Sequence, residues 1–172
     1  MKQISDEVFY ADDLIVKISR GEIQFLKERC NLTKRKRVRL CAHKNLDSDI
    51  HEMIIVLSNQ TYIRPHKHIN KTESFHIIEG LIDVVIFDET GNIVEVVHMG
   101  DLLSGHNFFY RLSDDYYHTP IIRSDFAVFH ETINGPFDRT DTIEAPWAPD
   151  EADFFGQKKY SERMLRDLDR LR

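Results

Sequence analysis

Residues 65–80 read PHKHINKTESFHIIEG, and this stretch decides the expected fold. His66 and His68 are two residues apart, so both imidazoles point to the same side of an extended strand. Turn-forming residues at 69–72 separate them from a second alternating run, which begins at Glu73. We therefore expect a hairpin that brings two imidazoles and a carboxylate together.

These three side chains form a set of potential metal ligands. Neutral imidazoles and a carboxylate suit a borderline divalent ion, so we expect iron, manganese, zinc or nickel as the cofactor. Calcium and magnesium prefer sites made of oxygen atoms alone. The competing interpretation of His66, His68 and Glu73 is a satisfied polar cluster inside a barrel.

Length and composition indicate one soluble domain. The chain has 172 residues, of which 41% are hydrophobic and 30% are charged. Its net charge of -6 gives no overall attraction to nucleic acid, and no apolar run is long enough to cross a membrane. The amino-terminal segment lacks the pattern of a signal peptide, so we expect a cytoplasmic protein without nucleic-acid or membrane partners.

Short alternating segments with frequent turns predict an all-β barrel or sandwich. Two helices flank it: residues 19–30, with a capping box, and residues 158–172, with an apolar stripe after a loop at 138–156. The expected strands are 7–10, 14–18, 35–43, 51–57, 61–68, 73–79, the two arms of a hairpin at 81–99, 107–112 after a turn that begins at 100, and 126–133. The chain thus divides into an extension (1–34), a barrel (35–137) and a carboxy-terminal loop and helix that pack on it (138–172).

The segment KRKRVRLCAHK at 34–44 holds the densest positive charge. As a strand it places Arg39 on one side with Arg35, Arg37, Cys41 and His43. This side is either a solvated edge, where cations discourage edge pairing, or a binding side for a phosphate or carboxylate. A nucleic-acid surface is disfavoured because aromatic residues are absent from it.

Arg64 shares the ligand side of the strand at 61–68, by the same alternation. It would therefore point into the cavity that holds the metal. There it either contacts an anionic substrate group or forms a structural ion pair.

The motif at 66–80 resembles that of a known superfamily. The order His-x-His, four residues, Glu, six residues, Gly is met by His66, His68, Glu73 and Gly80, and it is similar to the first metal-binding motif of the cupins. That motif usually opens with a Gly where this chain has Gln60. The resemblance implies a cupin double-stranded β-helix, a jelly-roll-like barrel with ligands inside its mouth and apolar walls, expected from Phe75, Phe108, Phe109 and Phe129.

The second cupin motif implies a further histidine ligand. Gly100-Asp101 followed by His118 resembles that motif, although the usual Pro-x-Gly before the histidine is missing. His106 is the rival candidate, in an expected turn. The resemblance therefore implies a metal site of four residues: His66, His68, Glu73 and His118.

Further segments resemble the WbuC family of cupin-fold metalloproteins, which are often encoded near O-antigen polysaccharide genes. They are RLCAH (39–43), HEMIIVL to YIRPHKH (51–68), YYHT (116–119), HETINGPFD (130–138) and APWAPDE (145–151). The resemblance covers roughly residues 35–150 and implies a single small cupin with a divalent metal.

Three classes of function remain open. The first is an isomerase or epimerase of an anionic sugar or nucleotide-sugar in cell-surface polysaccharide biosynthesis, with Glu131 or Tyr117 moving a proton and Arg64 and Arg39 binding the substrate. The second is an Fe(II)-dependent dioxygenase of a small molecule, and the third is a non-catalytic small-molecule-binding cupin. Cupins often pair through edge strands and extensions, so we expect a homodimer.

Overall fold

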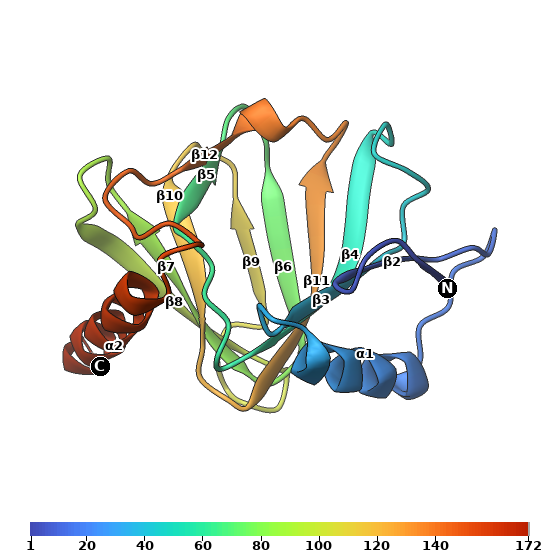
Figure 1. The fold of residues 1–172 in the computed structure, drawn as a ribbon, viewed down its shortest axis with the longest axis horizontal. Coiled ribbons are helices and arrows are strands. Elements are labelled where there is room, and N and C mark those ends of the chain that lie inside the picture. Colours follow the sequence, from blue (N-terminus) through green and yellow to red (C-terminus); the bar gives the residue numbers. More distant parts are fainter. Residues whose placement is uncertain (172) are drawn as a thin grey trace.

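The computed structural model describes residues 1–171, in which two β-sheets face each other and enclose a barrel (Figure 1). The seven-stranded sheet contains, in order of pairing, β1 (Lys2–Gln3), β2 (Val8–Tyr10), β3 (Arg37–Cys41), β4 (Ile50–Ser58), β11 (Phe126–Asn134), β6 (Glu73–Glu79) and β9 (Phe109–Leu112). The five-stranded sheet contains β12 (Thr142–Glu144), β5 (His66–His68), β10 (Tyr117–Ile122), β7 (Leu81–Phe87) and β8 (Ile93–Gly100).

The strand order is that of a jelly roll. Without the flanking β1, β2, β3 and β12, each sheet has four strands, ordered β4-β11-β6-β9 and β5-β10-β7-β8. Two such layers with crossing connections form the eight-stranded jelly roll that cupins share. The expected cupin fold is therefore confirmed.

Alternation along each strand builds the barrel core. Inward-facing side chains of both sheets form one buried cluster, which includes Phe75, Ile77, Ile82, Val84 and Phe129. Strands with one face inside and one outside produce such a core because their side chains alternate between the two faces.

The two helices cover opposite sides of the barrel (Figure 1). Helix α1 (Arg20–Leu32) packs Leu26 and Cys30 on the outer face of the seven-stranded sheet. Its amino terminus has the expected capping box, formed by Ser19 and Glu22. Helix α2 (Phe154–Arg170) packs on the outer face of the five-stranded sheet through Tyr160, Met164 and Leu168. Neither helix is long and apolar enough to cross a membrane.

The hairpin expected at 65–80 is wrong. Strand β5 belongs to the five-stranded sheet and β6 to the seven-stranded sheet, so the chain crosses the barrel between the two ligand segments. Gly80 then turns the chain back to β7 with a φ of 88°, and a Cβ atom there would lie 2.2 Å from the Phe126 carbonyl oxygen. The motif therefore ends on glycine because a side chain does not fit.

Other expected elements differ in their bounds. Residues 14–18 form no strand, and of the segment 61–68 only His66–His68 is a strand. The loop expected at 138–156 contains a short 3-10 helix (Arg139–Asp141) and β12, which pairs with β5. Helix α2 begins before residue 158, and the last residue of the expected helix, Arg172, lies outside the described residues.

Two expectations about surfaces are also wrong. Strand β3 is not an edge, because it pairs with β2 in parallel and with β4 in antiparallel orientation. Phe108 and Phe109 are 43% and 52% exposed, so they do not contribute to the cavity wall.

Candidate metal centre

Three histidines converge inside the barrel. His66 and His68 lie on β5, and the antiparallel register of β10 places His118 opposite His66. One ring nitrogen from each histidine lies within 4.8 Å of the others. Ligand atoms at about 2.1 Å from a common ion lie about 3–4 Å from one another, so the cluster can hold a metal ion after small side-chain adjustments.

On all three rings it is Nδ1 that contacts an oxygen atom of a backbone carbonyl or hydroxyl group, so Nε2 is the nitrogen that can bind a metal. Nδ1 of His66 lies 2.9 Å from the Arg64 carbonyl oxygen, and Nδ1 of His118 lies 3.0 Å from the Tyr116 carbonyl oxygen. Nδ1 of His68 lies 3.2 Å from the Thr142 hydroxyl. Because a carbonyl oxygen only accepts, we assign the proton of His66 and His118 to Nδ1, which leaves a lone pair on Nε2 for a metal.

Glu73 adds a carboxylate beside the three rings. Its Oε1 lies 2.9 Å from Nε2 of His118, and its Oε2 lies 3.5 Å from Nε2 of His68. Oε1 and the His118 Nε2 are buried, and apart from this approach to each other they have no partner among the described residues. A buried carboxylate oxygen and a buried imidazole nitrogen whose only partner is each other suit a shared cation, so the donor set fits a divalent ion.

The electrostatics of the cluster also favour metal binding. Burial, together with the neighbouring His118 and His68, lowers the pKa of His66 to about 3, so this ring is neutral at pH 7. Burial opposes ionisation of Glu73, but the adjacent His118 and His68 outweigh it and lower the pKa of Glu73. The Glu73 carboxylate likewise overcomes burial and raises the pKa of His118. A cation bound at this cluster would favour the neutral form of His118, because the metal and a proton compete for the same nitrogen.

The cluster forms part of the wall of a cavity of about 790 Å³. Apolar side chains of the seven-stranded sheet line part of it, among them Ile55, Leu57, Phe75 and Phe129. The volume is typical of a site for a small molecule, and the wall combines these apolar side chains with many charged and polar ones.

Glu131 lines the same cavity from β11, as its alternation with Phe129 and Ala127 predicts. Burial and the negative charge of Glu73 raise the pKa of Glu131 to about 8. A carboxyl group of this kind can exchange a proton near neutral pH.

Three arginines of the segment at 34–44 line the cavity along one side of β3. Arg35 and Arg37 form ion pairs with Glu7 and Glu151. Among the described residues, the Arg39 guanidinium has no hydrogen bond or ion pair, although its charge acts on Glu131 and partly offsets the rise in the pKa of that carboxyl group. Its donors are therefore available to an anion.

Arg64 also lines the cavity, but its guanidinium is occupied. Nη1 lies 2.9 Å from Glu144 Oε2 and 3.2 Å from Asp150 Oδ2, and Nη2 donates to the Ala145 carbonyl oxygen at 2.9 Å. Of the two roles considered for Arg64, the ion pair is therefore present, and the contact with substrate stays a prediction.

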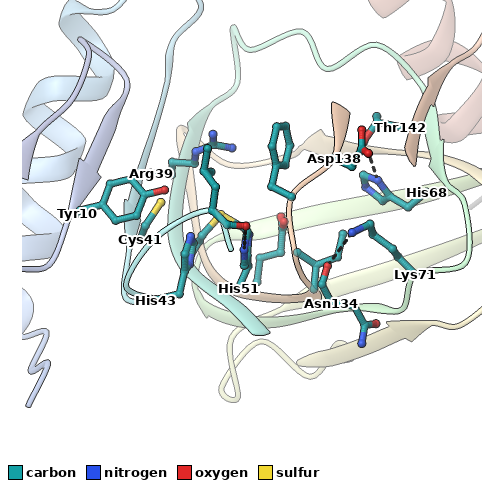
Figure 2. Close-up of a pocket in the computed structure, with 15 residues that line it drawn as sticks. Tyr10, Arg39, Cys41, His43, His51, His68, Lys71, Asn134, Asp138 and Thr142 are labelled. Carbon is teal, nitrogen blue, oxygen red and sulfur yellow. Dashed lines mark hydrogen bonds between the residues drawn. The ribbon is translucent and has the colours of Figure 1, made fainter. Parts of the chain in front are cut away.

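Figure 2 shows a smaller cavity of about 110 Å³, which shares part of its wall with the large one. Five residues line both cavities: Arg39, His68, Glu131, Phe137 and Thr142. Its remaining wall includes the rings of His43 and His51, which stack with their centroids 4.0 Å apart, and the thiol of Cys41.

Two candidates from the sequence lie elsewhere. Tyr117 is adjacent to His118 on β10, so its ring points to the opposite face of the sheet, where it packs against Trp147. His106 lies outside the histidine cluster, with its nearest ring contact to His98 at 6.5 Å. Thr142, which contacts His68, was missed because it lies in a segment interpreted as a loop.

The sequence is similar to one protein family, whose function is unknown. Residues 18–99 match a family model described as a domain of unknown function, DUF6016. No curated protein sequence matches this chain.

Solved structures show similarity in fold. Protein SO0799 from Shewanella oneidensis has a TM-score of 0.50 at 12% identity, over 70% of this chain and 75% of that one. The cupin domain of Schizosaccharomyces pombe Cnp3 has a TM-score of 0.44 at 11% identity, over 59% and 66%. A mutant of Bacillus subtilis oxalate decarboxylase OxdC has a TM-score of 0.43 at 19% identity, and the match covers 56% of this chain but only 24% of that larger chain.

Proposed function

We propose that this protein is a metal-dependent isomerase or epimerase of an anionic sugar or nucleotide-sugar. The single observation that supports this most is the convergence of metal ligands, a titratable carboxyl group and a free guanidinium on one cavity of about 790 Å³. The resemblance to the WbuC family suggests a role in cell-surface polysaccharide biosynthesis.

His66, His68, Glu73 and His118 would hold the metal. When bound, a divalent ion would supply Lewis-acid chemistry, which makes the C–H bond next to a substrate carbonyl more acidic. Glu131 then accepts that proton at its carboxylate and returns it to a different carbon or to the opposite face. Its pKa of about 8 lies close to neutral pH, where a group exchanges protons in both directions most efficiently.

Arg39 would bind the anionic group of the substrate. Its free guanidinium lies on the same side of the cavity as Glu131, and both residues also line the smaller cavity. The apolar wall that contains Phe75 and Phe129 would exclude water from the reacting carbon.

Oxygen chemistry is the second candidate. Three imidazoles and one carboxylate leave two open positions on a six-coordinate ion, and such positions allow dioxygen and a substrate to bind together. The same donor set therefore fits an Fe(II)-dependent dioxygenase.

Elemental analysis tests the metal site. The purified protein should contain about one divalent metal per chain. The His66→Ala/His68→Ala variant should lose it, whereas the control His106→Ala, outside the cluster, should retain it. No metal in the wild-type protein, even after reconstitution, would leave only a non-catalytic binding protein.

Turnover in deuterated water tests the reaction. Hexose phosphates and nucleoside-diphosphate hexoses are incubated with the metal-loaded protein, and deuterium at a substrate carbon is measured by mass spectrometry. We expect incorporation that Glu131→Gln reduces by about 100-fold or more. Oxygen consumption without deuterium incorporation would favour the dioxygenase instead.

We also propose a cytoplasmic homodimer. Strand β9 has no strand partner on its outer side within the described chain, and β8 is paired there only at its end, where Met99 bridges Asn107. Such edges can pair with a second copy. A monomeric mass in solution would contradict the dimer.

A further inference from the structure

The three histidines of the cluster are held in two different ways. His66 and His118 each contact the carbonyl oxygen of the residue two positions earlier, so their own strands orient them. His68 instead contacts a side chain, the Thr142 hydroxyl, which comes from a segment 74 positions later in the chain (Figure 2).

Backbone pairing places Thr142 at this point. Strand β12 pairs with β5 in antiparallel register, and Thr142 lies directly opposite His68. The two flanking hydrogen bonds, from Ile69 N to the Asp141 carbonyl oxygen and from Ala145 N to the Pro65 carbonyl oxygen, are both 2.8 Å long. Thr142 is therefore fixed relative to the strand that carries two of the ligands.

We name residues 137–151 the strap, because this segment runs along the rim of the large cavity between β11 and α2. Arg64 anchors it through Glu144, Asp150 and the Ala145 carbonyl oxygen. The Tyr62 hydroxyl donates to the Pro149 carbonyl oxygen at 2.8 Å. The segment before the ligand strand therefore holds the strap at several points.

We propose that Thr142 is a positioning residue for the metal centre and that the strap belongs to the site. The Thr142 hydroxyl accepts a hydrogen bond from Nδ1 of His68 and so presents Nε2 to the ion in the correct orientation. Arg64 affects the metal centre indirectly, because it holds in place the strap that carries Thr142. Partners of this kind typically change metal affinity by about 10–100-fold. The inference rests on the metal site of the proposed function but not on its reaction.

Affinity for Co²⁺ and Zn²⁺ tests the proposal without any substrate. Thr142→Val removes the hydroxyl and keeps the shape, so we expect about 10–100-fold weaker binding in competition with a chromophoric chelator. Thr142→Ser restores the hydroxyl and should bind within about threefold of wild type, a rescue that a packing role would not produce. The visible spectrum of the Co²⁺ form should change in the Val variant alone.

Thr140→Val is the matched control. Thr140 lies in the same strap, but its hydroxyl bonds to Asp138 and does not contact a ligand. Its metal affinity should equal that of wild type. Circular dichroism of the metal-free variants establishes that each is folded.

Three outcomes would overturn the proposal: wild-type affinity in Thr142→Val, an equal loss in Thr140→Val, or no metal binding by the wild-type protein. The last would also remove the proposed function. Normal metal binding without turnover would leave the role of Thr142 intact and contradict only the reaction.

Discussion

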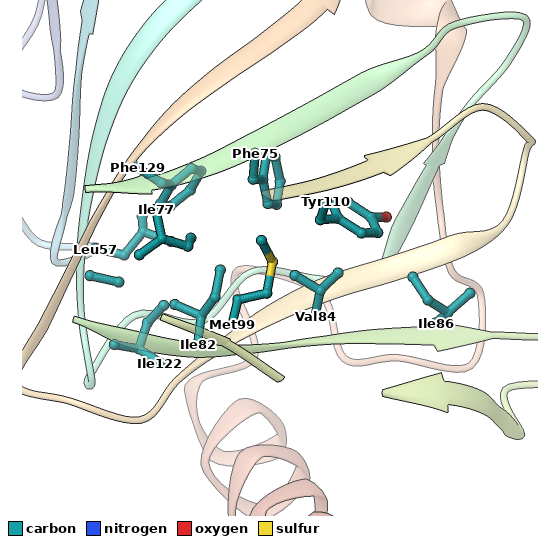
Figure 3. Packing of buried hydrophobic residues seen from close by; sticks show 11 residues of the cluster. Leu57, Phe75, Ile77, Ile82, Val84, Ile86, Met99, Tyr110, Ile122 and Phe129 are labelled. Atoms are coloured by element: carbon teal, nitrogen blue, oxygen red, sulfur yellow. The ribbon is translucent and has the colours of Figure 1, made fainter. Parts of the chain in front are cut away.

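The two ends of the barrel interior are built from the same strands but differ in chemistry. Along β6 the inward residues change from Glu73 to Phe75 and Ile77, and along the antiparallel β11 they change from Glu131 to Phe129. The carboxyl groups therefore meet at the mouth, and the apolar side chains meet below it (Figure 3). The alternation of side chains along a strand determines which residues face inward. The position of a residue along the strand determines whether a ligand can reach it.

The apolar end of the barrel contributes mainly to stability, and the polar mouth contributes mainly to function. The apolar end gains free energy from burial, whereas the mouth buries imidazoles and carboxylates that lose hydration. Without a cation, the close pair of Glu73 and His118 only partly offsets that cost. Substitutions at the apolar end should therefore change the free energy of unfolding, and those at the mouth should change what the protein binds.

The largest effect on stability is expected from Phe129→Ala. Phe129 is only 1% exposed, and its removal leaves a cavity in the core, so we expect a loss of about 3–5 kcal/mol in the free energy of unfolding. Urea titration followed by circular dichroism measures it. The control Phe109→Ala, at a half-exposed position, should change stability by about 0.5 kcal/mol or less. Equal losses in the two variants would contradict the division into two ends.

Addition of metal should have the next largest effect. A divalent ion that binds only the folded state, at about 100 times its dissociation constant, raises the free energy of unfolding by about 2.7 kcal/mol. Thermal unfolding of metal-free protein with and without the ion measures the shift. His118→Ala should abolish the shift, and His106→Ala should retain it. An equal shift in His118→Ala would place the ion elsewhere.

Much of the barrel could be predicted from local patterns. Alternation correctly placed Arg39 on the same side as Arg35 and Arg37, and Glu131 on the same side as Phe129, and the structure shows that both sides face the cavity. The same rule could have excluded Tyr117, because it neighbours His118 on one strand and must face the other way. Tyr117 is a candidate only because it lies next to His118 in the sequence, and neighbours on a strand face opposite sides.

Pairing between distant segments could not be predicted in the same way. The turn residues at 69–72 look alike whether the chain returns to the same sheet or crosses to the other, so the hairpin was the simpler interpretation. Strand β12 has three residues, too few to show a period, and only its pairing with β5 reveals Thr142 as the partner of His68. The partners of Arg64 lie 80 or more positions away, so no local signal indicated them.

The smallest effect is a pH dependence of stability at the mouth. The pKa of Glu131 is raised from 4.5 to about 8 in the folded protein, so folding favours its protonated form. That contribution is fully present below pH 4.5 and is lost as the pH rises through 8. Between pH 5 and 8, metal-free wild type should lose about 1–2 kcal/mol relative to Glu131→Gln, less than full linkage gives because solvent reaches the carboxyl group.

Urea titrations of both metal-free proteins at several pH values measure this difference, and the comparison cancels the titration of the histidines. Saturation with metal should reduce the difference, because a cation beside Glu73 offsets the negative charge that helps to raise the pKa of Glu131. Parallel stability curves for the two proteins would show that Glu131 titrates as an ordinary carboxyl group. A carboxyl group with an ordinary pKa is ionised near neutral pH and is a poor proton donor there. The proposed proton transfer would then need another residue.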